Sequence, residues 1–156
     1  MSESVMRRQL IELLTKENAH LTFDSAINQF AEGQYGRRID GQPHTAWEQL
    51  EHLRIAQWDI LEFSRNPNHK SPEWPNGYWP QQDAPPDAGA WDRSVDEFRR
   101  DLEAFCSLIG DAANDLFAPF PHGDGQTLLR EALVLGKHNS YHIGQLVLLQ
   151  KLLAAR

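Results

Sequence analysis

The chain has 156 residues, of which 40% are hydrophobic and 24% charged, and this composition indicates a globular protein rather than a disordered one. Its formal net charge of −7 argues against nucleic-acid binding, because phosphate recognition depends on clustered Lys and Arg side chains. No segment approaches the ~20 consecutive apolar residues of a membrane span, and charges interrupt the first apolar stretch, which excludes a signal peptide. The single cysteine, Cys106, excludes an internal disulfide and is expected to be a small buried thiol. We therefore expect one soluble, cytoplasmic domain spanning residues 1–156.

The first third of the chain predicts two helices and a loop. Apolar positions at helical spacing favour a helix from Ser4 to about Asn18, and a short helix should start at Thr22 and run to about Phe30. The three glycines between Glu32 and Pro43 indicate a loop.

The second long helix should begin at a capping box formed by Thr45 and Glu48 and continue to Arg65, where Asn66-Pro67 ends it. Apolar residues nearly encircle this helix, so it should be heavily buried. His52 lies near its middle.

A loop of unusual length follows, from Asn66 to about Asp87, with six prolines and the aromatic residues Trp74, Tyr78 and Trp79. Two interpretations are open and compatible. The aromatics either pack on the helices as part of a compact loop, or they form one wall of a ligand pocket.

The third long helix is predicted from about Asp87, as its N-cap, to Ile109, and residues 111–125 form a connector rich in proline and glycine. Its apolar positions follow one another at steps of four and three residues. They are Trp91, Val95, Phe98, Leu102, Phe105 and Ile109.

Thr127 should cap the last helix, which runs from Leu128 to Leu153. Asn139 and His142 interrupt its apolar stripe, and His138 lies beside them. Polar groups in a buried stripe carry a desolvation cost unless a partner satisfies them. The remaining stripe positions are Leu128, Ala132, Leu135, Leu146, Leu149 and Leu153. Together the segments predict an all-α fold, a four-helix bundle with long loops between helices 1 and 2 and between helices 2 and 3.

His138 and His142 have the spacing of a metal-binding pair on one helical face, although this spacing also occurs in ordinary hydrogen-bonded histidines. Asn139 occupies the position of the glutamate in the zinc-protease motif H-E-x-x-H, which disfavours that activity. His52 on a neighbouring helix would supply a third imidazole and leave at least one coordination position open, as metal-assisted catalysis requires. Glu51, Asp59, Glu131 and Gln145 are candidates for further ligands or hydrogen-bonding partners of the ligands, and for Glu51 and Glu131 the alternative of a surface acid stays equally open.

Two segments carry a resemblance to a known family. The segment WEQLEHL around His52, followed much later by HNSYHIGQ from His138 to Gln145, resembles the DinB-like (DinB/YfiT) superfamily over essentially the whole chain. Many relatives have an aspartate immediately before the first histidine of the pair, where this chain has Lys137. The resemblance implies a four-helix bundle in which His52, His138 and His142 hold a divalent metal, usually zinc or nickel. It also implies a homodimer and an activity such as thiol-dependent transfer or metal-dependent hydrolysis.

Three hypotheses remain open from the sequence. The first is a metal-dependent enzyme that acts on a small-molecule substrate with an activated water or a low-molecular-weight thiol. Arg54 and Lys137 are the nearest cations for an acidic thiol, and His20 is a further general-base candidate. The second is a non-catalytic, metal-stabilised homodimeric bundle that acts as a binding or stress-response module. The third is a metal-free bundle in which the histidines are only packed.

Overall fold

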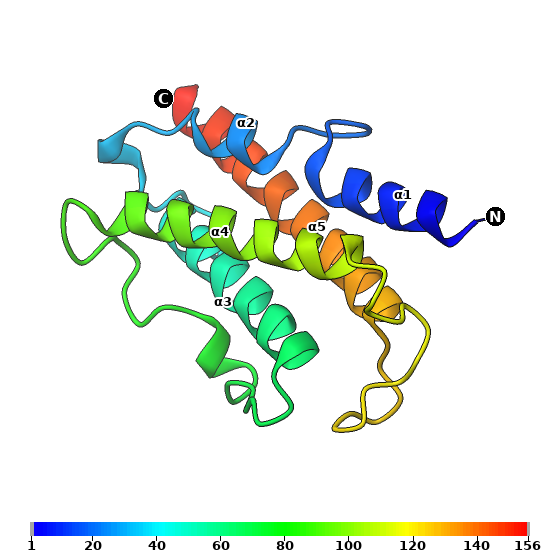
Figure 1. Ribbon diagram of the computed structural model, residues 1–156. Coiled ribbons are helices and arrows are strands. Elements are labelled where there is room, and N and C mark those ends of the chain that lie inside the picture. The colour runs from blue at the N-terminus through cyan, green and yellow to red at the C-terminus, as the bar shows by residue number, and fades with distance from the viewer. Residues whose placement is uncertain (1, 156) are drawn as a thin grey trace.

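A computed structural model describes residues 2–155, and within this range the chain is all helical, as predicted, with no β-strand. Four long helices lie beside one another, and a short helix, α2 (Phe23–Ile27), packs on the last of them (Figure 1). None of the described helices is both long and apolar enough to cross a bilayer. The long helices are α1 (Glu3–Thr15), α3 (Ala46–Arg65), α4 (Ala90–Gly110) and α5 (Leu128–Ala154).

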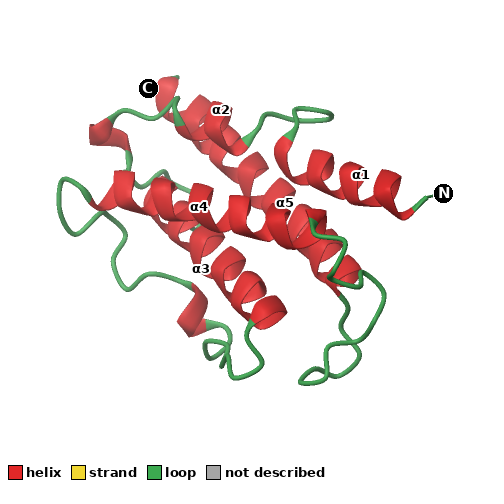
Figure 2. Ribbon diagram, viewed as in Figure 1, coloured by secondary structure: helices red, strands yellow, loops and turns green. Residues whose placement is uncertain are grey.

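The arrangement of the long helices brings distant parts of the chain together. Helix α3 packs against α4 and α5, and α1 packs against the same two helices. The loops before and after α3 contain the 3₁₀ turns η1 (Glu32–Gln34) and η2 (Asn76–Tyr78), and Figure 2 shows the long path of the second loop. Because α3 packs along α5, the middle of α3 lies beside the middle of α5. The candidate histidines of the sequence analysis belong to these two segments.

The two long helices that threonine caps, α3 and α5, begin where they are predicted. Thr45 Oγ1 accepts a hydrogen bond from the Glu48 amide at 3.2 Å, and the Glu48 carboxylate accepts one from the Thr45 amide at 2.7 Å. Thr127 likewise accepts from the Arg130 amide at 3.1 Å. These bonds satisfy amides that the first helical turn leaves without partners, so they fix the start of α3 and α5.

The start of α4 corrects the prediction that Asp87 is its N-cap. The helix begins at Ala90 with Gly89 as N-cap. The Asp87 carboxylate instead accepts from the Gly89 amide at 2.9 Å and from the Arg93 guanidinium at 2.7 Å. Asp87 therefore stabilises the turn before the helix and pairs with Arg93, but it is not the N-cap.

Helices α1 and α2 end earlier than predicted. The helix expected to reach Asn18 ends at Thr15, and the one expected to reach Phe30 ends at Ile27. Residues 15–18 carry no apolar side chain that further helix could bury, so no packing compensates for ordering another turn.

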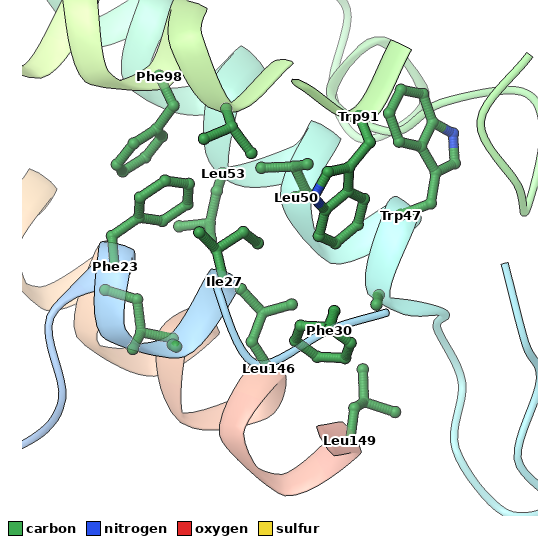
Figure 3. Close-up of a cluster of buried hydrophobic side chains, with 14 of the residues drawn as sticks. Phe23, Ile27, Phe30, Trp47, Leu50, Leu53, Trp91, Phe98, Leu146 and Leu149 are labelled. Atoms are coloured by element: carbon green, nitrogen blue, oxygen red, sulfur yellow. The ribbon is translucent and has the colours of Figure 1, made fainter. Parts of the chain in front are cut away.

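The predicted apolar stripes of α4 and α5 face the interior. Every position of the α5 stripe is buried, including Asn139 and His142, and Leu102 is the one half-buried member of the α4 stripe. In Figure 3, Phe23 of α2 and Phe98 of α4 face each other, with ring centroids 3.9 Å apart. The same cluster continues through Leu50 and Leu53 of α3, so the residues on either side of His52 belong to the main core.

Arg7 anchors α1 to the end of α4. Its guanidinium is buried and donates to the carbonyl oxygens of Ile109 at 2.6 Å, Asp111 at 2.9 Å and Asn114 at 2.6 Å. The last carbonyls of a helix lack intrahelical partners, so the guanidinium supplies hydrogen-bond donors to carbonyl oxygens that would otherwise have none.

We expect Arg7→Met to lower the free energy of unfolding by about 2–4 kcal/mol, because it leaves buried carbonyls without a donor. Arg8→Met is the matched control, since Arg8 is exposed and makes one ion pair, to Glu12 at 3.9 Å. That variant should change the free energy of unfolding by about 0.5 kcal/mol or less. Urea denaturation measures both values, and equal losses in the two variants would contradict the anchoring role.

Candidate metal centre

Three histidines from two helices converge at the α3–α5 contact. His52 comes from α3, and His138 and His142 come from successive turns of α5. One ring nitrogen of each lies within 4.8 Å of the others, and the Nε2 atoms of His52 and His138 are 3.0 Å apart. His52 and His142 are 3% and 8% exposed. The three predicted residues therefore form one cluster that could hold a metal ion.

Hydrogen bonds fix the orientation of two of the rings. His52 Nδ1 lies 2.9 Å from the carbonyl oxygen of Tyr78, and His142 Nδ1 lies 2.7 Å from Oε1 of Gln49. Both partners are acceptors, so each Nδ1 carries the proton of a neutral ring. The Nε2 atoms of both histidines are then left with lone pairs, which is the state that a metal ligand requires.

Burial keeps the cluster neutral. It lowers the pKa of His138 to about 4 and that of His142 to about 3, and the neighbouring histidines add to both shifts. Burial also lowers the pKa of His52, although the hydrogen bond to the Tyr78 carbonyl opposes this shift. At neutral pH all three imidazoles are therefore neutral, so a cation does not have to displace the extra proton of an imidazolium ring.

The donor set fits a divalent transition metal. Imidazole nitrogens suit zinc, nickel, copper and iron, whereas calcium and magnesium prefer oxygen ligands. Two imidazole nitrogens on a tetrahedral zinc ion lie about 3.3 Å apart, given Zn–N bonds of about 2.0–2.1 Å. The His52–His138 separation of 3.0 Å is close to that value. The residues present thus match a three-nitrogen site.

The loop between α3 and α4 covers one side of the cluster. The indole of Trp79 stacks on the His52 ring with centroids 4.0 Å apart, and on His44 with centroids 3.9 Å apart. Trp74, in contrast, is 72% exposed. Trp79 therefore packs on His52 of α3, as the first interpretation of this loop predicts, while Trp74 is exposed. That the loop forms a wall of a ligand pocket stays a prediction.

Asp59 ties the same loop to α3. Its carboxylate accepts from the Tyr78 hydroxyl at 2.6 Å and lies 2.7 Å from Nε2 of His69. Burial raises the pKa of Tyr78 to about 12, and the Asp59 carboxylate adds to this shift, so the hydroxyl stays a donor. The Tyr78 carbonyl that orients His52 is thereby held in place by the side chain of the same residue.

The predicted partners of the histidines are only partly present. Asp59 acts through Tyr78, but Glu51 accepts from Arg54 at 2.8 Å and pairs with Ser94, and Glu131 pairs with Arg130. No hydrogen bond from the Gln145 side chain to the cluster is found in the described residues. Of the two alternatives for Glu51 and Glu131, the structure does not show the one in which they contact the cluster, because nearby cations pair with both carboxylates.

Sequence reasoning missed Gln49 and the carbonyl of Tyr78. Gln49 lies one helical turn before His52 and is a buried amide on an otherwise apolar face, and this pattern was a usable signal. A backbone carbonyl has no signature in the sequence, and its position depends on how the loop packs.

The other reactive candidates lie outside the cluster. Burial raises the pKa of Cys106 to about 11, so this thiol is protonated at neutral pH and is a poor nucleophile. His20 Nε2 lies 2.8 Å from Ser140 Oγ, and Arg54 is engaged by Glu51 and by Glu97 at 3.1 Å. None of these side chains is one of the three cluster residues.

One family matches the chain in comparisons with known proteins. The model of the DinB superfamily matches residues 17–146, a range that contains all three histidines and begins after the end of α1. No curated protein and no solved structure matches the chain significantly.

Tyr78→Phe should destabilise the protein by about 1–3 kcal/mol, because it removes a donor from the buried Asp59 carboxylate. Tyr141→Phe is the matched control, since Tyr141 is 65% exposed, and it should leave stability within about 0.5 kcal/mol of wild type. Thermal unfolding of the metal-free proteins compares the two. A Tyr78→Phe protein as stable as the control would show that the bond to Asp59 does not hold the loop.

Proposed function

Because the chain belongs to the DinB superfamily, we propose that it is a metal-dependent enzyme whose divalent cation, zinc or nickel, is held by His52, His138 and His142. The observation that carries the proposal is the convergence of three neutral imidazoles, two of which have their Nδ1 atoms fixed by acceptors. Three protein ligands leave a coordination position open for a substrate or a small nucleophile. The scaffold of this proposal is a four-helix bundle formed by α1, α3, α4 and α5 within a single domain of residues 1–156.

The proposed chemistry is thiol transfer or hydrolysis. A bound divalent cation supplies Lewis-acid polarisation and lowers the pKa of a coordinated water or thiol. The roles of the chain's own residues follow from their contacts. Gln49 and the Tyr78 carbonyl orient two imidazoles, and Trp79 shields one side of His52 from water. A low-molecular-weight thiol is proposed as the co-substrate of the transferase, and a cytoplasmic location would supply it in reduced form.

One observation favours the second candidate, a non-catalytic, metal-stabilised homodimeric bundle that serves as a binding or stress-response module. The stacking of Trp79 on His52 places the α3–α4 loop beside the cluster, where a substrate would otherwise approach. In this alternative the metal stabilises the bundle, and its remaining coordination position is not used for chemistry.

Wild-type protein should bind about one Zn²⁺ or Ni²⁺ per chain, and His142→Ala should weaken binding by at least about a hundredfold, because it removes one of three ligands. His122→Ala is the matched control, since His122 is exposed and lies outside the cluster. Metal content after dialysis and competition with a chelating dye measure both effects. A wild-type protein that takes up neither metal would refute the metal site.

An open coordination position separates the enzyme from the module. Wild-type protein loaded with Co²⁺ should change its visible absorption spectrum when a small thiol is added, because the thiolate enters the cobalt coordination shell. An unchanged spectrum would favour the module. Turnover of an electrophilic test substrate with and without the thiol then distinguishes transfer from hydrolysis.

A further inference from the structure

A buried chain of amide groups ends beside His138. Gln57 is 0% exposed and donates from Nε2 to the carbonyl oxygen of Phe98 at 2.7 Å. Its Oε1 accepts from Nδ2 of Asn139, which is 6% exposed, at 3.1 Å. The chain thus runs from the backbone of α4 through α3 to α5, across an otherwise apolar contact.

The hydrogen bonds of this chain fix which way each amide faces. The Phe98 carbonyl can only accept, so Gln57 must present its NH₂ group to it and its oxygen to Asn139. Asn139 must then present its own NH₂ group to Gln57. Its Oδ1 is consequently directed away from Gln57, and this oxygen is buried without a hydrogen-bond partner.

A second buried atom without a partner belongs to the preceding residue, His138. This atom is Nδ1. On the other side of the ring, Nε2 lies 3.0 Å from the Nε2 of His52, which carries a lone pair because its Nδ1 is protonated. His138 must therefore carry its proton on Nε2 in the metal-free protein, and its Nδ1 has a lone pair that Asn139 Oδ1 cannot satisfy.

Metal binding reverses this arrangement. A ligand nitrogen needs a free lone pair, so coordination by His138 Nε2 requires that nitrogen to lose its proton while Nδ1 gains one. Solvent carries the proton from one to the other, and the net charge of the ring does not change. The new Nδ1–H is then a buried donor on the residue that precedes Asn139, and the two unsatisfied buried atoms, each costing about 1–3 kcal/mol, can pair.

We propose that Asn139, held by Gln57, is a positioning residue that orients His138 for metal through a hydrogen bond from His138 Nδ1 to Asn139 Oδ1. The inference rests on the proposed metal site. It gives His138 the acceptor that Tyr78 provides for His52 and Gln49 provides for His142, so each ligand is oriented by one oxygen.

The test measures Zn²⁺ affinity by chelator competition for three variants, together with their metal-free melting temperatures. Asn139→Leu should bind Zn²⁺ about 10–100-fold more weakly than wild type, as loss of a ligand's hydrogen-bonding partner typically does. Asn139→Asp loses the donor to Gln57 but keeps an acceptor for His138 Nδ1, and it should bind within about threefold of wild type or more tightly. Ser140→Ala is the control, because Ser140 is the next residue of α5 and its hydroxyl contacts His20 instead of the cluster.

The outcomes distinguish the inference from the metal site itself. If wild type binds no Zn²⁺, the proposed function and this inference both fail. If wild type binds Zn²⁺ and folded Asn139→Leu binds it equally well, or Asn139→Asp binds as weakly as Asn139→Leu, only the inference is overturned.

A measurement on wild type avoids dependence on whether a variant folds. Imidazole ¹⁵N NMR should show the His138 proton on Nε2 in metal-free protein and on Nδ1 after Zn²⁺ is added. A proton on Nδ1 in both states would overturn the proposed exchange of tautomers.

Discussion

The hydrogen bonds from the Nδ1 atoms of His52 and His142 determine whether the α3–α5 contact can bind a metal ion. A buried imidazole with both nitrogens free can rotate and change tautomer, whereas one whose Nδ1 donates to a fixed oxygen offers its Nε2 in one direction. The Tyr78 carbonyl and the Gln49 side chain impose this condition on His52 and His142. Burial also lowers the pKa values of His52 and His142, so both rings are neutral at neutral pH. The contact between α3 and α5 therefore contains nitrogen lone pairs where apolar side chains would otherwise pack.

The loop between α3 and α4 belongs to this centre as much as the helices do. Its Tyr78 supplies the carbonyl for His52 and is itself held by Asp59, and Trp79 stacks on the same ring. The loop is thus attached to α3 at His52 and at Asp59, which lies two turns further along the helix. The position of the loop and the orientation of His52 therefore depend on each other. Its proline content suits this role, because prolines reduce the conformational freedom lost when the loop is ordered.

The sequence predicts the parts of this account that depend on local periodicity. The α5 stripe, with Asn139 and His142 inside it, is buried at every predicted position, and the Thr45 capping box is present. Helix ends were less predictable, since the end of α1 and the start of α4 depend on which side chains find partners. The contacts around the histidines depend on how separate helices and a loop dock. From the sequence, Glu51 is a candidate partner of the histidines, but in the structure its carboxylate accepts hydrogen bonds from Arg54 and Ser94. The atom that orients His52 is instead the backbone oxygen of Tyr78.

X-ray absorption spectroscopy of the Zn²⁺-loaded wild-type protein tests the central claim most directly, because it identifies the ligand atoms without requiring turnover. The account predicts three imidazole ligands and one further nitrogen or oxygen atom, all at about 2.0–2.1 Å from the metal. A sulfur ligand at about 2.3 Å, or a shell with fewer than three imidazoles, would contradict the assignment of His52, His138 and His142 as the metal ligands.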